Sequence, residues 1–561
     1  MSNEITTADG GAATATPPAS RRRALWIVTG VAGLTGVVGL AALGGLAARD
    51  DRAGGPERVA DNRAAAPHDA GGDAHEDGGR GDHGEGRAGP GRGEWGGGEE
   101  HDGAREIPCD DDALVDALEL ANRGHGGTLK LAEDCTYEVG VKDRTVGGAL
   151  PAITQDVTVE GNGATIRRDA EDAFRIFRVA GGGRLTLDDL TVSGGSASEV
   201  RHPVPAASVA HGRPGAGDGG ALLVERGGSA HLSNVTLTDN NAEHNGGAVA
   251  NYGRVWLQES KVLHNHAQGD GGGIFNRGIL KVEDTAVDDN TAGGNGGGIA
   301  NGNGLSGKHG TDATELKSYV PSGKHDDAGT VEIIGSDHGK DGGKDGGKSS
   351  LSNNHAGRNG GGLFSSGGYV TVSFTHITGN TACENGGGSY AETTDLDLDK
   401  LVVAGNHADG DGGGLVVTGG KHWGYPNTKQ SASATIADTV IADNTANRFG
   451  GGIYNGEWLV KIEDGFLTPS ETEDDNAALT LRNTLAKDNT ALNGGGIFNN
   501  KATITLTKTH VTENTATDTS KLHRVAGGVL NHEGHVTLDD ESLISNNDPT
   551  NCANTVEDCF N

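Results

Sequence analysis

The chain has 561 residues, of which 98 are Gly, and its aromatic residues number only 9 Phe, 5 Trp and 7 Tyr. It carries 78 acidic and 45 basic residues, which gives a net charge of −33. A charge of that size and sign repels nucleic acid, so a nucleic-acid-binding function is excluded. So few aromatic side chains favour a solenoid with a narrow aliphatic core over a wide globular core.

Residues 1–48 read as an export signal or a membrane anchor. Arg21–Arg23 close a polar segment, residues 1–23, and the segment 24–48 carries no charge. Such a segment is long enough to span a bilayer, and its basic flank stays in the cytoplasm. Gly45–Ala47 offer a cleavage site of small residues. The segment is therefore either a cleaved export signal or, if it is not cut, a retained membrane anchor. In both cases everything after Ala48 is expected outside the cell.

Residues 49–105 are rich in Gly, Asp, His and Arg and contain hardly any aliphatic residue. This composition buries too little apolar surface to fold, so we predict a disordered linker. An N-terminal cap follows over residues 106–135. Acidic residues start a helix predicted over 111–122, and its apolar face would cover the open end of a solenoid core. That face consists of Leu114, Ala117, Leu118 and Ala121.

Four of the five cysteines bracket the two ends of the predicted fold. In an exported protein, cysteines placed in this way form local disulfides. We therefore predict a Cys109–Cys135 bond across the cap and a Cys552–Cys559 bond within a C-terminal tail, residues 546–561. Cys383 is left over, and we expect it to be a small buried residue.

Between the cap and the tail, residues 136–545 repeat one phrase, for example DDNTAGGNGGGIANG at 288–302. Uninterrupted copies lie about 25 residues apart, and a period of that length indicates a solenoid. The Asn that aligns the copies occurs at Asn240, Asn265, Asn290, Asn354, Asn380, Asn406, Asn444, Asn489 and Asn514.

Short strands fill the space between the phrases. In one repeat these are residues 274–276, 279–283 and 286–288, with alternating apolar and polar side chains. Three strands leave no room for a helix, which excludes leucine-rich, ankyrin and HEAT repeats. The fold predicted is all-β: a right-handed, single-stranded parallel β-helix of about a dozen coils, with strands about 4.8 Å apart.

The repeated Asn residues are predicted to stack into a buried ladder, each amide bonding to the next coil. A second column precedes the glycine corner of each coil, where turn-forming side chains are favoured. Its members are Asn245, Asp270, Asn295, Asn359, Asn385, Asp411 and Asn493.

The residues after the cap, LTLDDLTVSGG at 185–195, resemble the start of exported bacterial right-handed β-helix proteins. The repeats, with GGAV at 246–249, GGGI elsewhere and Asn three positions after an aliphatic residue, resemble the polymorphic outer-membrane protein repeats of chlamydiae. That family's signatures are GGA[ILV] and FxxN, and the similarity covers roughly residues 106–545. It implies surface display and adhesion. Aliphatic residues replace the family's Phe, and with only the short tail after Ser545 we expect no autotransporter β-barrel and an exporter with a single membrane.

Acidic residues beside the ladder form a possible Ca²⁺ edge or a catalytic carboxylate set, but they recur as a turn motif and no Arg or Lys joins them. A solvated turn edge is the favoured interpretation, with no cofactor. These residues are Asp239, Asp289, Asp443, Asp488 and Glu513.

Insertions interrupt the repeat after Asn290 and within 418–435 and 456–476. Loops that leave a solenoid on one side often bind the ligand. Their aromatic residues Trp423, Tyr425 and Trp458 are our candidates for ligand contact, although tolerated insertions would look the same.

Taken together, the sequence predicts a non-enzymatic β-helix, secreted or anchored outside the cell by its N-terminal segment. It would serve as a binding or adhesion module for a surface glycan or protein. Two alternatives remain open: a polysaccharide lyase or glycoside hydrolase acting on acidic glycans, and a structural spacer at the cell surface.

Overall fold

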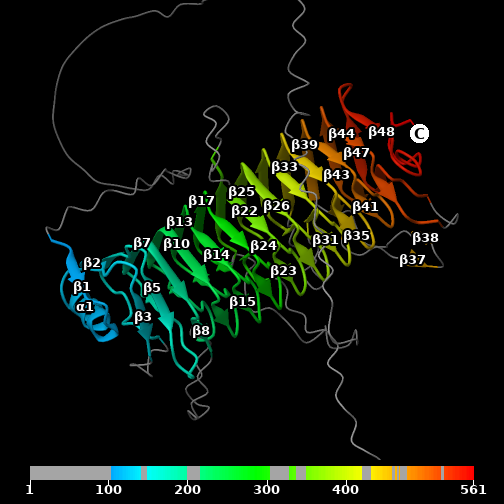
Figure 1. Ribbon diagram of the computed structural model, residues 1–561. Helices are drawn as coiled ribbons and strands as arrows, with labels where there is room; N and C mark the ends of the chain where they lie inside the picture. The colour runs from blue at the N-terminus through cyan, green and yellow to red at the C-terminus, as the bar shows by residue number, and fades with distance from the viewer. Residues whose placement is uncertain are drawn as a thin grey trace, which may run out of the picture. The chain divides into compact units, whose positions relative to one another are not determined.

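The computed structural model describes residues 103–140, 148–198, 215–303, 328–336, 349–419, 431–457, 462–463, 466–467, 477–519 and 524–560. The segments 1–23 and 24–48 and nearly all of the linker, as well as Trp423, Tyr425 and Trp458, lie outside these ranges. No helix within them is long and apolar enough to cross a membrane. The described chain forms a right-handed parallel β-helix whose coils stack along one axis (Figure 1).

We call the 25-stranded sheet the front sheet; each repeating coil contributes two strands to it. Its N-terminal strands are β1 (Arg105–Ile107), β2 (Gly127–Leu131), β3 (Thr136–Val139), β4 (Asp156–Glu160), β5 (Thr165–Arg168), β7 (Arg184–Ser193) and β10 (Ser229–Thr238). The first strand of each later coil is β13 (Arg254–Gln258), β17 (Ile279–Glu283), β21 (Thr330–Ile334), β25 (Tyr369–Ser373), β29 (Asp395–Asp399), β33 (Ala432–Ala437), β39 (Ala477–Arg482), β43 (Thr503–Thr507) and β47 (His535–Leu538). The second is β14 (Lys261–Leu263), β18 (Ala286–Asp288), β22 (Ser349–Ser352), β26 (Thr375–Thr378), β30 (Val402–Ala404), β34 (Val440–Ala442), β40 (Leu485–Lys487), β44 (His510–Thr512) and β48 (Leu543–Ser545).

Two further sheets close each coil, and a short hairpin stands apart from them. The 10-stranded side sheet consists of β8 (Ser196–Ala197), β11 (Asn241–Ala242), β15 (His266–Ala267), β19 (Thr291–Ala292), β23 (His355–Ala356), β27 (Thr381–Ala382), β31 (His407–Ala408), β35 (Thr445–Ala446), β41 (Thr490–Ala491) and β45 (Thr515–Ala516). The 11-stranded back sheet consists of β6 (Phe177–Val179), β9 (Leu222–Val224), β12 (Val249–Asn251), β16 (Ile274–Asn276), β20 (Ile299–Asn301), β24 (Leu363–Ser366), β28 (Ser389–Glu392), β32 (Leu415–Thr418), β36 (Ile453–Gly456), β42 (Ile497–Asn500) and β46 (Val529–His532). The hairpin is β37 (Ile462–Glu463) with β38 (Phe466–Leu467).

The prediction of three strands per repeat is wrong, because each repeat contributes four. The additional strand is the residue pair that follows the ladder Asn, such as Thr291–Ala292 in β19. Two residues are too few to produce an alternating pattern, so the composition of a loop conceals a strand. Ala292 is buried in this pair and Thr291 is half-buried.

The core follows from strand alternation. In β17, Leu280 and Val282 are fully buried, whereas Ile279 at the start of the strand faces outward with 50% of its surface exposed. The partners in the next coil, Val331 and Ile333, stack on the first two in register. Every coil thus extends one column of aliphatic side chains, which suits the shortage of aromatic residues.

A second apolar cluster lies outside the back sheet. Ile274 of β16 belongs to the main core, whereas its neighbour Phe275 packs in the separate cluster with Phe364 and Phe498. The glycine corner of each coil folds over this cluster. A Cβ on Gly271, whose φ is +71°, would lie 2.4 Å from the Ile274 oxygen and 2.9 Å from the Phe275 Cα. The glycines therefore permit the corner to cover the strand that follows it.

The predicted caps are present at both ends. Helix α1 (Asp111–Arg123) begins at Asp110, whose side chain accepts a hydrogen bond from the Ala113 N–H, and it buries the predicted apolar face. At the other end the tail pairs with β46 through a hydrogen bond from the Val529 N–H to the Asn551 oxygen. Disulfides join Cys109 to Cys135 and Cys552 to Cys559.

The expectation that Cys383 is buried is wrong. Its thiol is exposed, and the Sγ lies 3.9 Å from Nε2 of His355. Ala382 before it points inward, and alternation along the chain turns Cys383 outward. Partial burial, together with the charges of Asp409 and Glu384, raises the pKa of this thiol. A thiol with a raised pKa is a poor nucleophile.

Candidate ligand-binding face

The Asn ladder uses every hydrogen-bonding position of its amides. Oδ1 of Asn290 accepts the backbone N–H and the side-chain Nδ2–H of Asn265, both at 3.0 Å. Nδ2 of Asn290 donates to Oδ1 of Asn354 at 3.1 Å and to the Val262 oxygen at 2.9 Å. An amide has two acceptor and two donor positions, and all four are filled. The nine predicted residues therefore form a structural ladder, which continues into the tail through Asn547 and Asn551.

The corner column is also structural, and it contains buried carboxylates. Asn295 donates its backbone N–H and its Nδ2–H to Oδ1 of Asp270, at 2.7 and 3.0 Å. Burial raises the pKa of Asp270, opposed by these two bonds. Burial likewise raises the pKa of Asp411 to about 6, opposed by the charge of Arg448, whose Nε lies 3.5 Å away. Three coils, with Asp218, Asp270 and Asp411, thus place an acid where their neighbours have Asn.

Sequence reasoning missed two further columns. The first is a column of hydroxyl side chains between the paired strands of the front sheet; for example, Oγ of Ser260 accepts the Val235 N–H at 3.1 Å. The second is a run of Asn at the back-sheet ends, where Nδ2 of Asn251 donates to Oδ1 of Asn276 and that residue donates to Asn301, each at 2.8 Å. The recurring phrase Ile-x-Asn could have revealed the second column.

The acidic residues beside the ladder form a turn edge. All five candidates are exposed and have positive φ, in the left-handed region that Asp and Asn tolerate in turns. Contrary to expectation, a lysine joins them: Nζ of Lys487 lies 3.0 Å from Asp488. In the described ranges no group of three His, Cys, Asp or Glu side chains is arranged to hold a metal ion.

The outer face of the front sheet carries side chains that differ from coil to coil. In one register column, Trp256 stacks on His231 with ring centroids 4.4 Å apart, and Nζ of Lys281 lies 4.9 Å from the Trp256 ring. Lys281 also forms an ion pair with Glu283 at 3.0 Å. These contacts fill that part of the face with its own side chains.

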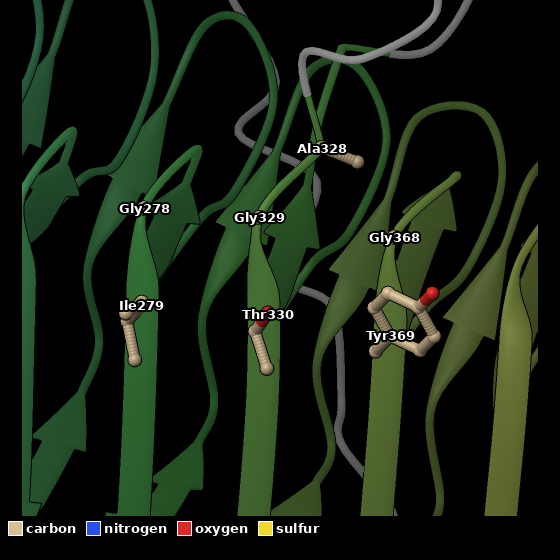
Figure 2. A pocket seen from close by; sticks show the side chains of 7 residues that line it. All are labelled: Gly278, Ile279, Ala328, Gly329, Thr330, Gly368 and Tyr369. Atoms are coloured by element: carbon tan, nitrogen blue, oxygen red, sulfur yellow. The ribbon is translucent and has the colours of Figure 1, made fainter. Parts of the chain in front are cut away.

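Farther along this face the surface is hollowed. Ile279, Thr330 and Tyr369 occupy the same position on the neighbouring strands β17, β21 and β25 (Figure 2). The two large side chains are 50% and 64% exposed, and the smaller Thr330 between them forms the floor of a hollow of about 510 Å³. Gly329 lies at its upper edge, where a Cβ would come within 2.0 Å of the Gly278 oxygen.

A second hollow, of about 650 Å³, adjoins the first at Tyr369. Three carboxylates project into it from alternate positions of β29, at Asp395, Asp397 and Asp399. Lys400 pairs with Asp399 at 3.2 Å, and Arg482 lines the far side. Among the described residues, no hydrogen bond or ion pair reaches the carboxylates of Asp395 and Asp397.

This face was not predicted from the sequence. The segment DLDLD at 395–399 shows by alternation that its Asp residues face outward. Asp395 follows Tyr369 by one uninterrupted repeat, so this pairing could have been counted from the sequence, whereas an insertion separates Tyr369 from its other neighbour, Thr330. The sequence-based candidates Trp423, Tyr425 and Trp458 lie outside the described residues, so their role stays a prediction.

Comparison with known proteins finds no matching family model and no matching curated protein. Several solved structures are similar. The A-module of mannuronan C-5 epimerase AlgE6 from Azotobacter vinelandii is 16% identical, with 78% of this chain and 98% of that chain covered and a TM-score of 0.34. Tailspike protein 3 of bacteriophage CBA120 is 10% identical over 79% and 59% of the two chains, with a TM-score of 0.35. PfbA, a surface adhesin of Streptococcus pneumoniae, is 10% identical over 78% and 90%, with a TM-score of 0.27. At these identities and scores, the likenesses assign no activity to this chain.

The two disulfides indicate the cellular compartment of the protein. Disulfides form and persist in oxidising compartments and are rare in the cytosol. Both bonds close short local loops at the ends of the solenoid. The described chain therefore has the features of an exported protein.

Proposed function

We propose that this chain is a binding module, secreted or held at the cell surface by residues 24–48, whose front face binds an extended glycan. The observation that carries the proposal is the exposed Tyr369 ring at the junction of the two hollows. A sugar ring offers apolar C–H faces and a rim of hydroxyl groups. Tyr369 supplies an apolar platform, and the neighbouring Thr330 and Asp395 supply hydrogen-bonding groups.

The variation among coils supports this placement. Buried columns repeat the same side chains because each coil needs the same internal hydrogen bonds. Outward positions of the front sheet do not repeat: the column through β13, β17, β21, β25 and β29 reads Trp256, Lys281, Glu332, Thr371 and Asp397. Specific recognition requires such singular surfaces. The resemblance to chlamydial surface repeats is in keeping with a binding role.

Two other functions compete with this one. An enzyme acting on acidic glycans would have to bring a polyanion to the Asp395 and Asp397 carboxylates, which repel it unless a cation intervenes. A lyase of that kind would release an unsaturated, ultraviolet-absorbing product from polyuronate. A purely structural spacer would need the buried columns but no exposed Tyr369.

Binding of the full chain to an array of immobilised glycans tests the proposal. Tyr369→Ala should abolish the signals given by the unaltered chain. Thr503→Ala changes the same position of the coil on β43, away from both hollows, and should leave them unchanged. If the two variants bind alike, the front-face hollows are not the site. Calcium-dependent release of unsaturated product would favour the lyase instead.

A further inference from the structure

The second hollow carries negative charge that the chain itself does not neutralise. Asp395 and Asp397 are exposed on β29 and lie about 7 Å apart along the strand, as alternate residues do. Lys400 pairs with Asp399, and Arg482 lies in the same register column as Asp399, two strands away. No cation among the described residues pairs with the carboxylates of Asp395 and Asp397. Their mutual repulsion, in a chain of net charge −33, is relieved when a cationic ligand binds.

An aromatic ring stands beside this charge. Tyr369 is the direct register partner of Asp395 on the neighbouring strand, about 4.8 Å away across the sheet. An exposed ring attracts a cation through its face, and a carboxylate next to it attracts the same cation by its charge. A protonated amino group is the chemical group that satisfies both.

The length of the face that contains the two hollows indicates that its ligand is an oligomer. The residues that line the two hollows lie on six neighbouring strands, β17, β21, β25, β29, β33 and β39. Five spacings of about 4.8 Å give a face roughly 24 Å long. Only one part of it is acidic, because Ile279, Thr330 and Tyr369 form an uncharged stretch at the other end.

We propose that the front face binds an amino-sugar oligomer with protonated amino groups. Ammonium groups lie at Asp395 and Asp397, and an uncharged part of the oligomer lies over Thr330 and Tyr369. This inference rests on the proposed glycan-binding function and narrows its ligand to a cationic glycan. The charge of the hollow disfavours a polyuronate for the same reason.

A basic peptide is the other class of ligand that this charge could attract. Peptides commonly add to a free sheet edge or lay an amphipathic helix in a deep apolar groove. Here the strands are paired on both sides and the hollows are shallow, with short hydroxyl and carboxylate side chains on the floor. These features match the hydroxyl rim of a sugar better than a row of peptide side chains.

Calorimetric titration of the full chain with four hexamers tests the inference. Three share one β-1,4-linked backbone and differ at carbon 2: glucosamine, N-acetylglucosamine and glucose; the fourth is hexalysine. The glucosamine hexamer should bind with 1:1 stoichiometry and about tenfold more tightly than the other two sugars, the effect expected of two solvated ion pairs. Added salt should weaken this binding alone among the three sugars.

Two double variants test whether Asp395 and Asp397 cause the tighter binding of the glucosamine hexamer. Asp395→Asn with Asp397→Asn should lower the affinity for the glucosamine hexamer about tenfold, to that of the neutral sugars. Asp188→Asn with Asp540→Asn removes the same two charges from exposed positions outside the hollows and should change nothing. Equal losses in both pairs would show unspecific attraction to the net charge and overturn the inference.

The remaining outcomes separate the two proposals. If all three sugars bind equally and Tyr369→Ala removes that binding, the face binds glycans but the ammonium inference is wrong. If no sugar binds and Tyr369→Ala leaves every array signal unchanged, the proposed function fails as well. If hexalysine binds more tightly than the glucosamine hexamer, and if the Asp395→Asn, Asp397→Asn variant loses that binding, the ligand is a basic peptide and the glycan proposal is wrong.

Discussion

At the scale of single residues, this chain shows how a composition typical of loops becomes a rigid interior. Asn is abundant because each ladder amide fills two donor and two acceptor positions, so its burial leaves nothing unsatisfied. Gly is abundant because the corners leave no space for a Cβ. The abundance of Asn and Gly therefore does not indicate a flexible chain, because neighbours in the adjacent coils fix both residues in place.

Replacing Asn290 with Leu should lower the free energy of unfolding by about 1–3 kcal/mol. The change strands the Asn265 donors and the Val262 oxygen in the core, and an unsatisfied buried polar group costs that much. Denaturant melts followed by circular dichroism measure the effect. Lys261→Ala, at an exposed position one coil away, should stay within about 0.5 kcal/mol. Equal midpoints for the two variants would contradict the ladder's role.

Asp411→Asn should stabilise the protein at neutral pH. The pKa of Asp411 is about 6 in the folded chain and about 3.9 when unfolded, so the fold favours the protonated form. Stability is therefore lost as the pH rises from about 4 to about 6, and at pH 7 the variant should gain up to about 3 kcal/mol. The new amide can donate to Asn385, as Asn385 does to Asn359.

Melting temperatures at pH 4.5 and pH 7.5 test whether the stability gained by Asp411→Asn increases with pH. The gain from Asp411→Asn should be present at pH 7.5 and nearly vanish at pH 4.5. Asn385→Asp makes the opposite change and places a second, partly buried carboxylate beside Asp411, so it should destabilise the chain most at pH 7.5. A gain from Asp411→Asn at pH 4.5 as large as that at pH 7.5 would exclude titration of Asp411 as the cause.

At the scale of elements, the sequence predicts well what repeats and poorly what is singular. The fold class, the cap helix at 111–122 and the strands at 274–276, 279–283 and 286–288 agree with the structure. Each rests on a pattern many residues long. The strand pair Thr291–Ala292 and the exposure of Cys383 escaped because two residues carry no periodic signal.

The candidate site escaped for a related reason. The pairing of Tyr369 with Asp395 could have been counted, because the two residues lie one uninterrupted repeat apart. The pairing of Tyr369 with Thr330 and Ile279 runs across insertions, and the register cannot be counted through insertions of variable length. The acidic turn edge was recognisable, since it recurs, but recurrence marks a structural requirement. The proposed binding surface consists of outward positions that do not repeat.

Deleting residues 420–430 should leave the β-helix folded. The segment connects β32 to β33, which lie in successive parts of one coil, and the removal of a long connection costs little loop entropy. Circular dichroism and the melting temperature should be nearly unchanged. Glycan binding should fall if Trp423 and Tyr425 contact the ligand, whereas binding that survives the deletion but not Tyr369→Ala assigns recognition to the front face. A large drop in melting temperature would show that the insertion supports the coil.

At the scale of the whole molecule, each coil is stabilised by its neighbours, so the two ends are the places where unfolding starts. The cap helix covers one end. The tail covers the other, where Asn547 accepts ladder bonds from Asn514 at 2.9 and 3.0 Å and donates the next ones to Asn551. Stability of the solenoid therefore depends on short terminal elements outside the repeat.

Removing residues 546–561 should destabilise the C-terminal coils by about 1–3 kcal/mol, because Asn514 and the Val529 N–H lose their partners. Hydrogen exchange should accelerate in β44 and β46 and remain slow in the central coils. Cys552→Ser with Cys559→Ser keeps the tail but opens its loop and should give a smaller effect. Uniform acceleration along the chain would contradict unfolding from the end.

The direction of the ladder bonds has an electrostatic consequence. Each ladder amide points a side-chain N–H toward the next coil on the C-terminal side, so the amide dipoles add along the column as peptide dipoles do in a helix. The partial positive charge therefore gathers at the C-terminal end, opposite to its location in an α-helix. The tail that meets this end contains Asp548, Glu557 and Asp558 and no basic residue. In the corner column the amides of Asn295, Asn359 and Asn385 point the other way, toward the N-terminal side, so in these coils the two columns oppose each other's fields.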